Sequence, residues 1–426
     1  MLLAFFRLIG KIFFREIVIE GRENLPASGP SILASNHPND LLDPLLTLFF
    51  SPPFRLRHIA KSTLFQVPLI GFILRRMRAI PVLRHREAQG PIDYSSFFDE
   101  CVGALAEGDT IVIFPEGGSS ETPFIGPLKT GAARMYFLAR QRGLDVPIVP
   151  VGINYEEGSI FRSSVLLHVA KPVDCSRFEA LHASDPAAAI QELTTEIHRV
   201  LGDHVFQAET FQDRELIILL ERVYFESQRG HDWADRYRRL AEFKPRVTEL
   251  RHCCSQEMVR LRRLVARYRR LVRLVATRTG ETPATPMAAI LGATGSLLAY
   301  AGWIFNWIPY RIVQWLVGRR RLPRTDIATT TITWSLVAFP LAYLAEGLLI
   351  ASLFGWEAGL AFGVGIMPFS YLALRYFEWR ETLGIRPPSP AALFRGRWSH
   401  RTSRRLQRLR EKIMREVEGF PVTPLK

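Results

Sequence analysis

The sequence has few cysteines and no pattern of metal ligands. Four cysteines occur in 426 residues: Cys253 and Cys254 are adjacent, and neither Cys101 nor Cys175 has a partner at a regular spacing. Disulfide frameworks and zinc sites need regularly spaced cysteines, so neither is predicted, as is usual for a reducing compartment. Glycine-rich nucleotide loops and acid pairs are also lacking, and we expect no metal and no cofactor.

Acidic residues are too few to balance the basic ones. Lys and Arg number 55 against 41 Asp and Glu, which gives a net charge of +14. This excess suits an anionic partner, which can be nucleic acid, an acidic membrane face or a phosphorylated substrate. Hydrophobic residues make up 48% of the chain and form long runs, and the basic runs lack an aromatic base-stacking pattern. The composition therefore favours membrane lipid and excludes nucleic acid.

The first 15 residues lack an uncharged run long enough to span a membrane. The segment 1–15 is rich in Leu and Phe but is interrupted by Arg7 and Lys11. An interfacial amphipathic helix and a buried surface helix fit this pattern equally well.

Residues 16–180 alternate between strand-like and helix-like segments, which predicts an α/β domain. The expected strands are 17–20, 31–35, 57–60, 79–83, 110–114, 148–153 and 165–170. The expected helices are 44–50, 63–76, 94–107 and 128–140.

From residue 181 to 281 the strand signals disappear and the pattern is helical and basic. Apolar residues recur at alternating spacings of three and four: Leu261, Leu264, Tyr268, Leu271 and Val275. The opposite face of the predicted helix is rich in Arg. Either this face is solvated and the apolar seam packs a helical hairpin, or the face rests on anionic lipid. We favour the second interpretation because apolar stretches follow directly.

Residues 282–376 form the predicted membrane region, and 377–426 a basic cytoplasmic tail. The apolar stretches of the membrane region are 282–310, 327–354 and 358–374. Arg-rich segments precede the first stretch, follow it and follow the third, and short positive segments stay cytoplasmic. We therefore predict a transmembrane hairpin over 327–374 and a re-entrant or interfacial segment over 282–310. Glu346 should face protein, because an unpaired intramembrane carboxylate is costly.

A histidine and two carboxylates lie near the start of the α/β region. The apolar run 31–34 leads into Ser-Asn-His-Pro-Asn-Asp-Leu-Leu-Asp-Pro, which contains His37, Asp40 and Asp43. Asp43 followed by Pro44 is typical of a helix start with Asp as the N-cap. Asp43 would then hold one imidazole nitrogen of His37 and leave the other as a base. Alternatively, Asp43 only caps its helix and His37 only closes a turn.

This segment resembles the His–Asp motif of the glycerol-phosphate acyltransferases of phospholipid synthesis. Most of that superfamily has four residues between His and Asp; here there are five, with Asn two residues after His, which resembles the fungal-type glycerol-3-phosphate/dihydroxyacetone-phosphate acyltransferases. Later segments resemble the second, third and fourth family motifs: 79–84, 114–119 and 149–152. Many relatives have Arg at the position of Ser119. The resemblance covers the first 180 residues and implies a mixed sheet flanked by helices.

The resemblance implies acyl transfer from acyl-CoA or acyl carrier protein to position 1 of glycerol 3-phosphate, which makes lysophosphatidic acid. Dihydroxyacetone phosphate is a second candidate acceptor. A hydroxyl is a weak nucleophile at neutral pH and needs a base to remove its proton. His37 is the candidate base, because the ordinary pKa of histidine lies nearest to neutral pH. Asp43 would fix its tautomer, with Asp40 as the rival. Backbone N–H groups near Gly117 and Gly118 would stabilise the oxyanion.

The resemblance also implies an acceptor site of cations and one carboxylate. Arg84 ends the second motif and would bind phosphate. Glu116 would hydrogen-bond the glycerol hydroxyls. The assigned acceptor-binding residues are Lys61, Arg84, Glu116, Gly117, Gly118, Ser119 and Lys129. Each of these cations also fits an ordinary surface charge.

Two other functions remain open at this stage. One is acylation of lysophosphatidic acid at position 2, which makes phosphatidic acid. The other is a non-enzymatic membrane scaffold with an inactive acyltransferase fold, against which the intact His37, Asp43, Arg84 and Glu116 argue. We expect an integral membrane protein with its catalytic domain on the cytoplasmic face. Its partners would be membrane lipid, the acyl donor and a phosphorylated glycerol acceptor.

Overall fold

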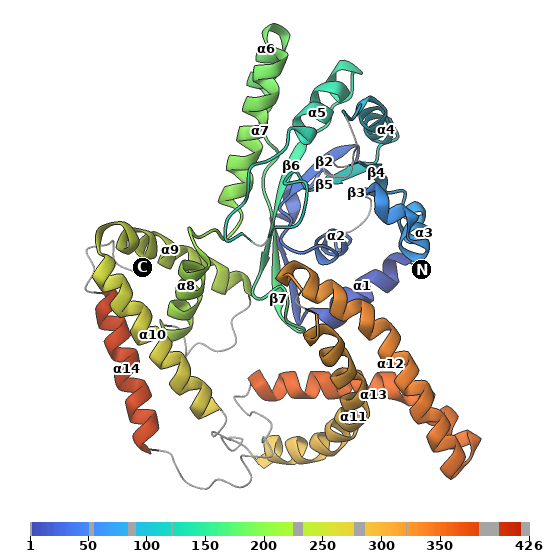
Figure 1. Cartoon of the computed structure of the whole chain (residues 1–426), viewed down its shortest axis with the longest axis vertical. Helices are drawn as coiled ribbons and strands as arrows, with labels where there is room; N and C mark the ends of the chain where they lie inside the picture. The colour runs from blue at the N-terminus through green and yellow to red at the C-terminus, as the bar shows by residue number, and fades with distance from the viewer. Residues whose placement is uncertain are drawn as a thin grey trace. The chain divides into compact units, whose positions relative to one another are not determined.

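The computed structural model describes residues 2–50, 55–83, 91–120, 122–224, 233–276, 286–320, 322–382 and 400–418. The chain divides into two compact units. The first contains Met1–Arg214, Asp232–Arg238 and Pro323–Thr329, and the second contains Glu215–His231, Arg239–Leu322 and Thr330–Lys426. Figure 1 labels their elements.

A seven-stranded sheet forms the centre of the first unit, and all seven predicted strands are confirmed. They are β1 (Glu16–Glu20), β2 (Ser31–Ser35), β3 (Leu56–Lys61), β4 (Ile80–Val82), β5 (Thr110–Ile113), β6 (Ile148–Tyr155) and β7 (Ser164–Val169). Their order is β1-β7-β6-β2-β5-β3-β4. Only β6 and β7 pair antiparallel, so the sheet is mixed, as expected. The carboxyl ends of β2, β3, β4, β5 and β6 therefore meet at one edge.

Helices precede, connect and follow the strands of the first unit. The first unit contains α1 (Leu2–Phe13), α2 (Leu42–Thr47), α3 (Pro68–Arg76), α4 (Ser95–Ala106), α5 (Gly131–Gln141), α6 (Ser176–Ser184) and α7 (Pro186–Asp203). At the start of α7 the Asp185 side chain accepts a hydrogen bond from the Ala188 amide (3.0 Å), and Pro186 occupies the first turn. Short 3₁₀ turns cover Arg22–Asn24 and Ser62–Gln66.

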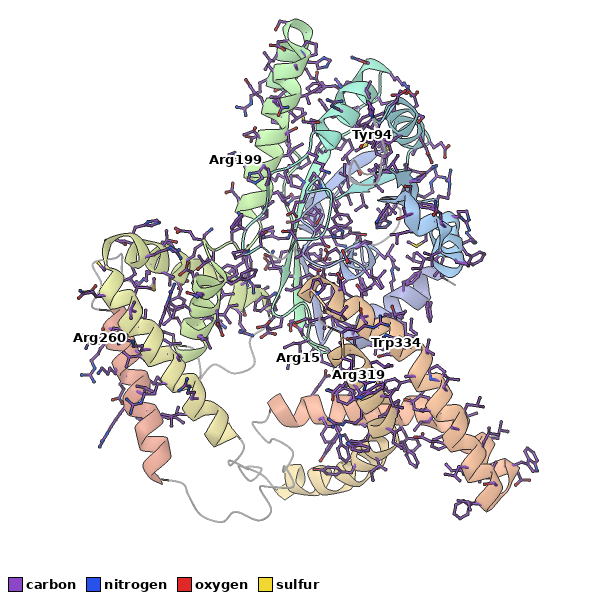
Figure 2. The ribbon with its side chains drawn as sticks, in the orientation of Figure 1. Arg15, Tyr94, Arg199, Arg260, Arg319 and Trp334 are labelled. Atoms are coloured by element: carbon purple, nitrogen blue, oxygen red, sulfur yellow. The ribbon has the colours of Figure 1, made fainter. Side chains whose placement is uncertain are left out.

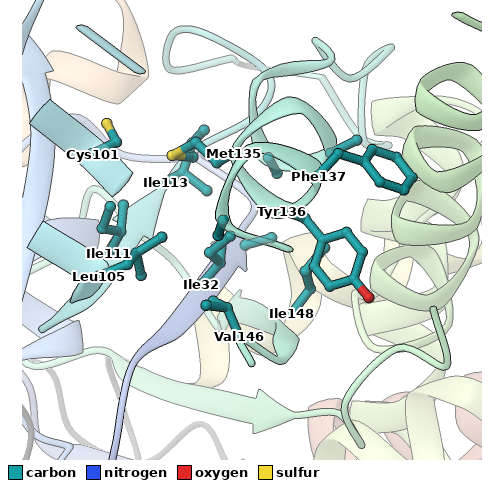
Figure 3. Close-up of a cluster of buried hydrophobic side chains, with 14 of the residues drawn as sticks. Ile32, Cys101, Leu105, Ile111, Ile113, Met135, Tyr136, Phe137, Val146 and Ile148 are labelled. Carbon is teal, nitrogen blue, oxygen red and sulfur yellow. The ribbon is translucent and has the colours of Figure 1, made fainter. Parts of the chain in front are cut away.

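The main hydrophobic core packs one face of the sheet against helices. Ile32 of β2, Ile111 of β5 and Ile148 of β6 are fully buried together with Leu105 of α4 and Met135 of α5 (Figure 3). Because strand side chains alternate between faces, every second residue of these strands points into this core. The core holds β2 and β5 in register and so fixes the loops at their carboxyl ends.

Helix α1 packs on the first unit by one face only. A Cβ at Gly10 would lie 2.7 Å from the Phe49 ring, and Arg7 Nε donates to the Leu48 carbonyl (2.7 Å). The other face exposes large apolar side chains: Leu3, Phe5, Leu8 and Ile12. An interfacial helix requires such an exposed apolar face.

Helices make up the described part of the second unit. They are α8 (Phe211–Tyr224), α9 (Trp233–Cys253), α10 (Ser255–Ala276), α11 (Pro286–Gly318), α12 (Arg324–Phe354), α13 (Trp356–Thr382) and α14 (His400–Glu418). Of these, α8, α9 and α12 begin in the first unit. Two of the helices α8 to α14 are long and apolar enough to cross a membrane: Thr325–Phe354 and Trp356–Glu378. They contain the predicted hairpin stretches and are separated by Gly355, whose φ is +93°.

Polar side chains join the three apolar helices. Asn306 of α11 donates to Ser370 Oγ of α13 (2.7 Å), and Tyr343 of α12 donates to Asn306 Oδ1 (2.6 Å). Glu346 is half-buried, and its one buried carboxylate oxygen has no hydrogen-bond partner among the described residues, so the expectation that it faces protein stays a prediction. Helix α11 is continuous over 33 residues, which differs from a chain that dips and turns back within 282–310.

Candidate active site

The loop after β2 carries His37 and is fixed by hydrogen bonds to β6. The side chain of Asn36 donates through Nδ2 to the Ile153 carbonyl (3.0 Å) and accepts through Oδ1 from the Ile153 backbone N–H (2.7 Å). Ser35 Oγ donates to the Val151 carbonyl (2.7 Å). These side-chain hydrogen bonds continue the pairing of β2 with β6 past the last paired residues, and they hold the loop at the carboxyl edge of the sheet.

His37 and Asp43 form a buried hydrogen-bonded pair. His37 Nδ1 lies 2.7 Å from Asp43 Oδ2, which also accepts from the Asn39 amide (2.7 Å). An ionised carboxylate only accepts, so Nδ1 carries the proton and Nε2 keeps its lone pair. Burial raises the pKa of Asp43, and the hydrogen bonds from His37, Tyr155 and Asn39 act in the opposite direction.

The predicted N-cap role of Asp43 is wrong. Helix α2 begins at Leu42 with Leu41 as its N-cap residue, and Asp43 lies inside the first turn. Its carboxylate turns back to His37 and to the Asn39 amide instead of capping the helix. The rival Asp40 is exposed and lies beside Asp326, whose pKa it raises. The geometry therefore pairs His37 with Asp43.

Tyr155, at the end of β6, completes this chain of hydrogen bonds and was not predicted from the sequence. Its hydroxyl donates to Asp43 Oδ1 (2.5 Å), so both carboxylate oxygens are engaged. Burial and the negative charge of Asp43 raise the pKa of Tyr155 well above its usual value, so the hydroxyl keeps its proton. A hydroxyl at the carboxyl end of a strand beside β2 is the signal that could have identified it.

The turn after β5 supports His37 from the other side. Glu116 Oε1 accepts from the His37 amide (2.8 Å), and Glu116 Oε2 accepts from the Gly126 amide (3.4 Å). The Ser120 amide donates to the His37 carbonyl (3.0 Å), and the Phe114 ring stacks on the imidazole at 4.2 Å. Burial raises the pKa of Glu116. Glu116 thus holds the His37 backbone, a role beyond the predicted acceptor contact.

Gly117 and Lys129, both predicted acceptor residues, lie together. The φ of Gly117 is +77°, a backbone conformation that favours glycine, and a Cβ there would lie 2.6 Å from Lys129 Nζ. The Gly117 amide donates to the Phe114 carbonyl (3.0 Å), which removes it from the candidate oxyanion donors. Gly118 remains a candidate donor, and Ser119 follows it on the same half-exposed turn.

Lys61 and Arg84 complete the predicted acceptor set. Lys61 is half-buried and ends β3 at the same sheet edge as His37. Arg84 lies outside the described residues. The described residues contain no group of three or more His, Cys, Asp or Glu side chains that could hold a metal ion.

A pocket of about 150 Å³ lies beside the His37 loop. Its polar lining includes Asn39, Glu116, Ser120, Thr122 and Arg214. Its volume is below the ~300–1,000 Å³ of sites for drug-sized ligands. The pocket therefore has room for a small polar molecule next to the loop that carries the base.

Known proteins and one family model are similar in sequence to part of this chain. Residues 16–154 match the Acyltransferase family model. The chloroplastic 1-acyl-sn-glycerol-3-phosphate acyltransferase of Arabidopsis thaliana is 30% identical over 39% of this chain and 46% of its own length. The 1-acyl-sn-glycerol-3-phosphate acyltransferase of Bacillus subtilis is 27% identical over 41% of this chain and 83% of its own. Glycerol-3-phosphate O-acyltransferase 1 of Saccharomyces cerevisiae is 27% identical over 31% and 18%.

The match to the family model ends at residue 154, before the helical and membrane segments. This chain spans about half the length of the Arabidopsis relative and less than a fifth of the yeast relative. The matched segment contains β1 to β6 with His37, Asp43, Glu116 and Lys129. Residues 16–154 are therefore similar to the Acyltransferase family, and the similar proteins are named as 1-acyl-sn-glycerol-3-phosphate acyltransferases and a glycerol-3-phosphate O-acyltransferase.

Proposed function

We propose that this protein transfers a fatty acyl group from an acyl thioester to position 1 of glycerol 3-phosphate, which yields lysophosphatidic acid. The observation that carries the proposal is the buried pair of His37 Nδ1 and Asp43 Oδ2 at 2.7 Å. A general base of this kind typically contributes ~10²–10⁴ in rate.

The reaction needs one base and no covalent enzyme intermediate. His37 Nε2 takes the proton from the acceptor hydroxyl while the hydroxyl oxygen attacks the thioester carbon. The tetrahedral oxyanion is stabilised by backbone N–H groups such as that of Gly118. When the carbon–sulfur bond breaks, the imidazolium returns the proton to the leaving thiolate. Asp43 and Tyr155 hold the imidazole in the required orientation throughout.

Two observations support the small acceptor. The pocket of about 150 Å³ beside Glu116 suits a phosphorylated glycerol better than an acylated one. Five residues separate His37 from Asp43, as in the fungal-type enzymes that the motif resembles. Arg84, Lys129 and Lys61 are the cations we assign to the acceptor phosphate, in place of the Arg that many relatives have where this chain has Ser119.

Acylation of lysophosphatidic acid is the alternative. It is favoured by the similarity to the Arabidopsis and Bacillus proteins, which are named 1-acyl-sn-glycerol-3-phosphate acyltransferases. For either acceptor, helices α12 and α13 would anchor the enzyme in the membrane. We propose that the catalytic unit lies on the cytoplasmic side, where acyl donors are made.

One assay separates the candidates. The purified protein is offered glycerol 3-phosphate, dihydroxyacetone phosphate and lysophosphatidic acid separately, each with acyl-CoA and with acyl carrier protein. Glycerol 3-phosphate should give the highest kcat/KM. Use of lysophosphatidic acid alone would establish the alternative, and no transfer to any acceptor would support an inactive scaffold.

A further inference from the structure

Helices α10 and α14 pack against each other, although three apolar helices separate them in the sequence (Figure 1). Leu261, Val265 and Tyr268 of α10 are buried, as are Leu409 and Ile413 of α14. An ion pair between Arg260 and Glu416 (2.7 Å) joins the two surfaces (Figure 2 labels Arg260). The residues before and after the membrane region therefore form one structure.

The ion pair shows which stripes of the two helices run side by side. On α10, Arg263, Arg267 and Arg270 follow Arg260 at spacings of three, seven and ten, so they continue its stripe. On α14, Lys412 and Arg408 precede Glu416 by four and eight residues and continue its stripe in the same way. We call these six cations the basic band: Arg260, Arg263, Arg267, Arg270, Arg408 and Lys412.

The basic band is exposed, and two carboxylates lie on its stripes: Glu416 on α14 and Glu257, three residues before Arg260, on α10. All six side chains are exposed, and within the described part of the chain an ion pair is made only by Arg260, to Glu416. Glu411 lies on the neighbouring stripe of α14. Six cations on two adjoining helices exceed what helix stability requires, because surface ion pairs contribute little.

We propose that the basic band docks on the surface of an anionic phospholipid bilayer. Charge complementarity is the first reason, since clustered cations next to a membrane segment bind acidic lipid. The second reason is reach: nine residues (277–285) separate α10 from α11, and 17 residues (383–399) separate α13 from α14. At ~3.3–3.6 Å per residue these segments span at most about 30 and 60 Å. The band is therefore tethered next to the bilayer that α12 and α13 would enter.

The test measures whether anionic lipid covers the band in the full-length protein. The chain is reconstituted in nanodiscs of phosphatidylcholine alone or with 30% phosphatidylglycerol, and acetylation of Lys412 by a water-soluble reagent is followed by mass spectrometry. Lys171, exposed on the first unit, is the internal reference. With phosphatidylglycerol, acetylation of Lys412 relative to Lys171 should slow at least about fivefold, the effect of one cation near such a surface. In 1 M NaCl, where the Debye length is ~3 Å, the protection should disappear.

Substitutions on one helix, read out on the other, test whether the band acts as a unit. The triple variant Arg263→Gln, Arg267→Gln, Arg270→Gln keeps helix-forming residues and should lose the protection of Lys412 on α14. The matched control replaces three exposed arginines of the first unit with Gln: Arg142, Arg177 and Arg199. In this control, phosphatidylglycerol should still protect Lys412 from acetylation. Equal acetylation of Lys412 in both lipids, or protection by an added RNA oligonucleotide but not by phosphatidylglycerol, would overturn the proposal.

Discussion

The hydroxyl of Tyr155 donates a 2.5 Å hydrogen bond to Asp43, from which it is separated by 112 positions in the chain. This bond engages Oδ1, while Oδ2 meets His37 and the Asn39 amide. Tyr155 ends β6 and His37 follows β2, and these strands are parallel neighbours in the sheet. The sheet topology therefore places a third group behind the His–Asp pair and fixes the plane of the carboxylate.

Tyr155→Phe should lower kcat about tenfold and change KM little. Hydrogen bonds to charged groups are worth ~1.5–3 kcal/mol, and a tenfold change in rate corresponds to ~1.4 kcal/mol. The hydrogen bond from Tyr155 lowers the pKa of Asp43. Its loss should therefore raise that pKa and move the acid limb of the pH–rate profile to higher pH in the variant. Tyr136→Phe, which removes a hydroxyl bonded to Glu179 away from the site, should leave both unchanged. An unaltered rate and profile for Tyr155→Phe would reduce Tyr155 to a packing residue.

Asp43→Asn and Asp40→Asn should differ sharply. Asp43 is fully buried and bonds His37, so its amide variant loses the acceptor that orients the imidazole and should lower kcat by ~10²–10⁴. Asp40 is exposed and lies beside Asp326, so its variant should stay within about threefold of wild type, as for a surface change. Both rates are measured with the same donor and acceptor. The reverse ranking would assign the orienting role to Asp40.

Folding stability should fall on acidification because His58 is buried in its neutral form. Burial lowers the pKa of His58 to about 4, and Nε2 bonds Thr47 Oγ1 (2.7 Å). Between pH ~6.5 and 4 the unfolded chain binds the extra proton, so stability decreases as pH falls through this window, by about 3 kcal/mol in total. His58→Gln should flatten the pH dependence of the thermal midpoint in detergent. An identical slope in this variant would exclude His58 as the cause.

The sequence predicts the strands and the His–Asp pair well because both depend on local pattern. The seven strands are short apolar runs, and His37 and Asp43 are six positions apart. By contrast, the Tyr155–Asp43 bond, the Glu116–His37 bond and the pairing of α10 with α14 each join residues far apart in the chain. Such contacts depend on strand order and helix packing, which periodicity does not encode. The N-cap interpretation of Asp43 failed because the carboxylate gains more from a buried histidine than from a helix end.

The membrane topology follows from which helices pack together. Because α10 and α14 bind each other, the chain from 277 to 399 must cross the bilayer an even number of times. The first turn of α12 belongs to the catalytic unit, where Thr329 Oγ1 accepts from the Leu41 amide (3.2 Å). We therefore predict that α12 and α13 cross and that α11 does not.

Cysteine labelling on intact cells tests this topology. Cys253 and Cys254 are first replaced by Ser, and one cysteine at a time is then introduced. A membrane-impermeant thiol reagent should label position 356 from outside and should not label positions 322 or 402. External labelling of position 322 would mean that α11 crosses the membrane.

The most direct test of the proposed function is the turnover of His37→Ala with glycerol 3-phosphate and the donor that the wild-type protein uses best. Loss of the base should reduce the rate of lysophosphatidic acid formation by at least ~10²–10⁴. The variant should keep the wild-type thermal midpoint and remain in the membrane fraction, which shows that the fold is intact. A rate within a few-fold of wild type, in a folded and membrane-bound variant, would contradict general-base catalysis by His37.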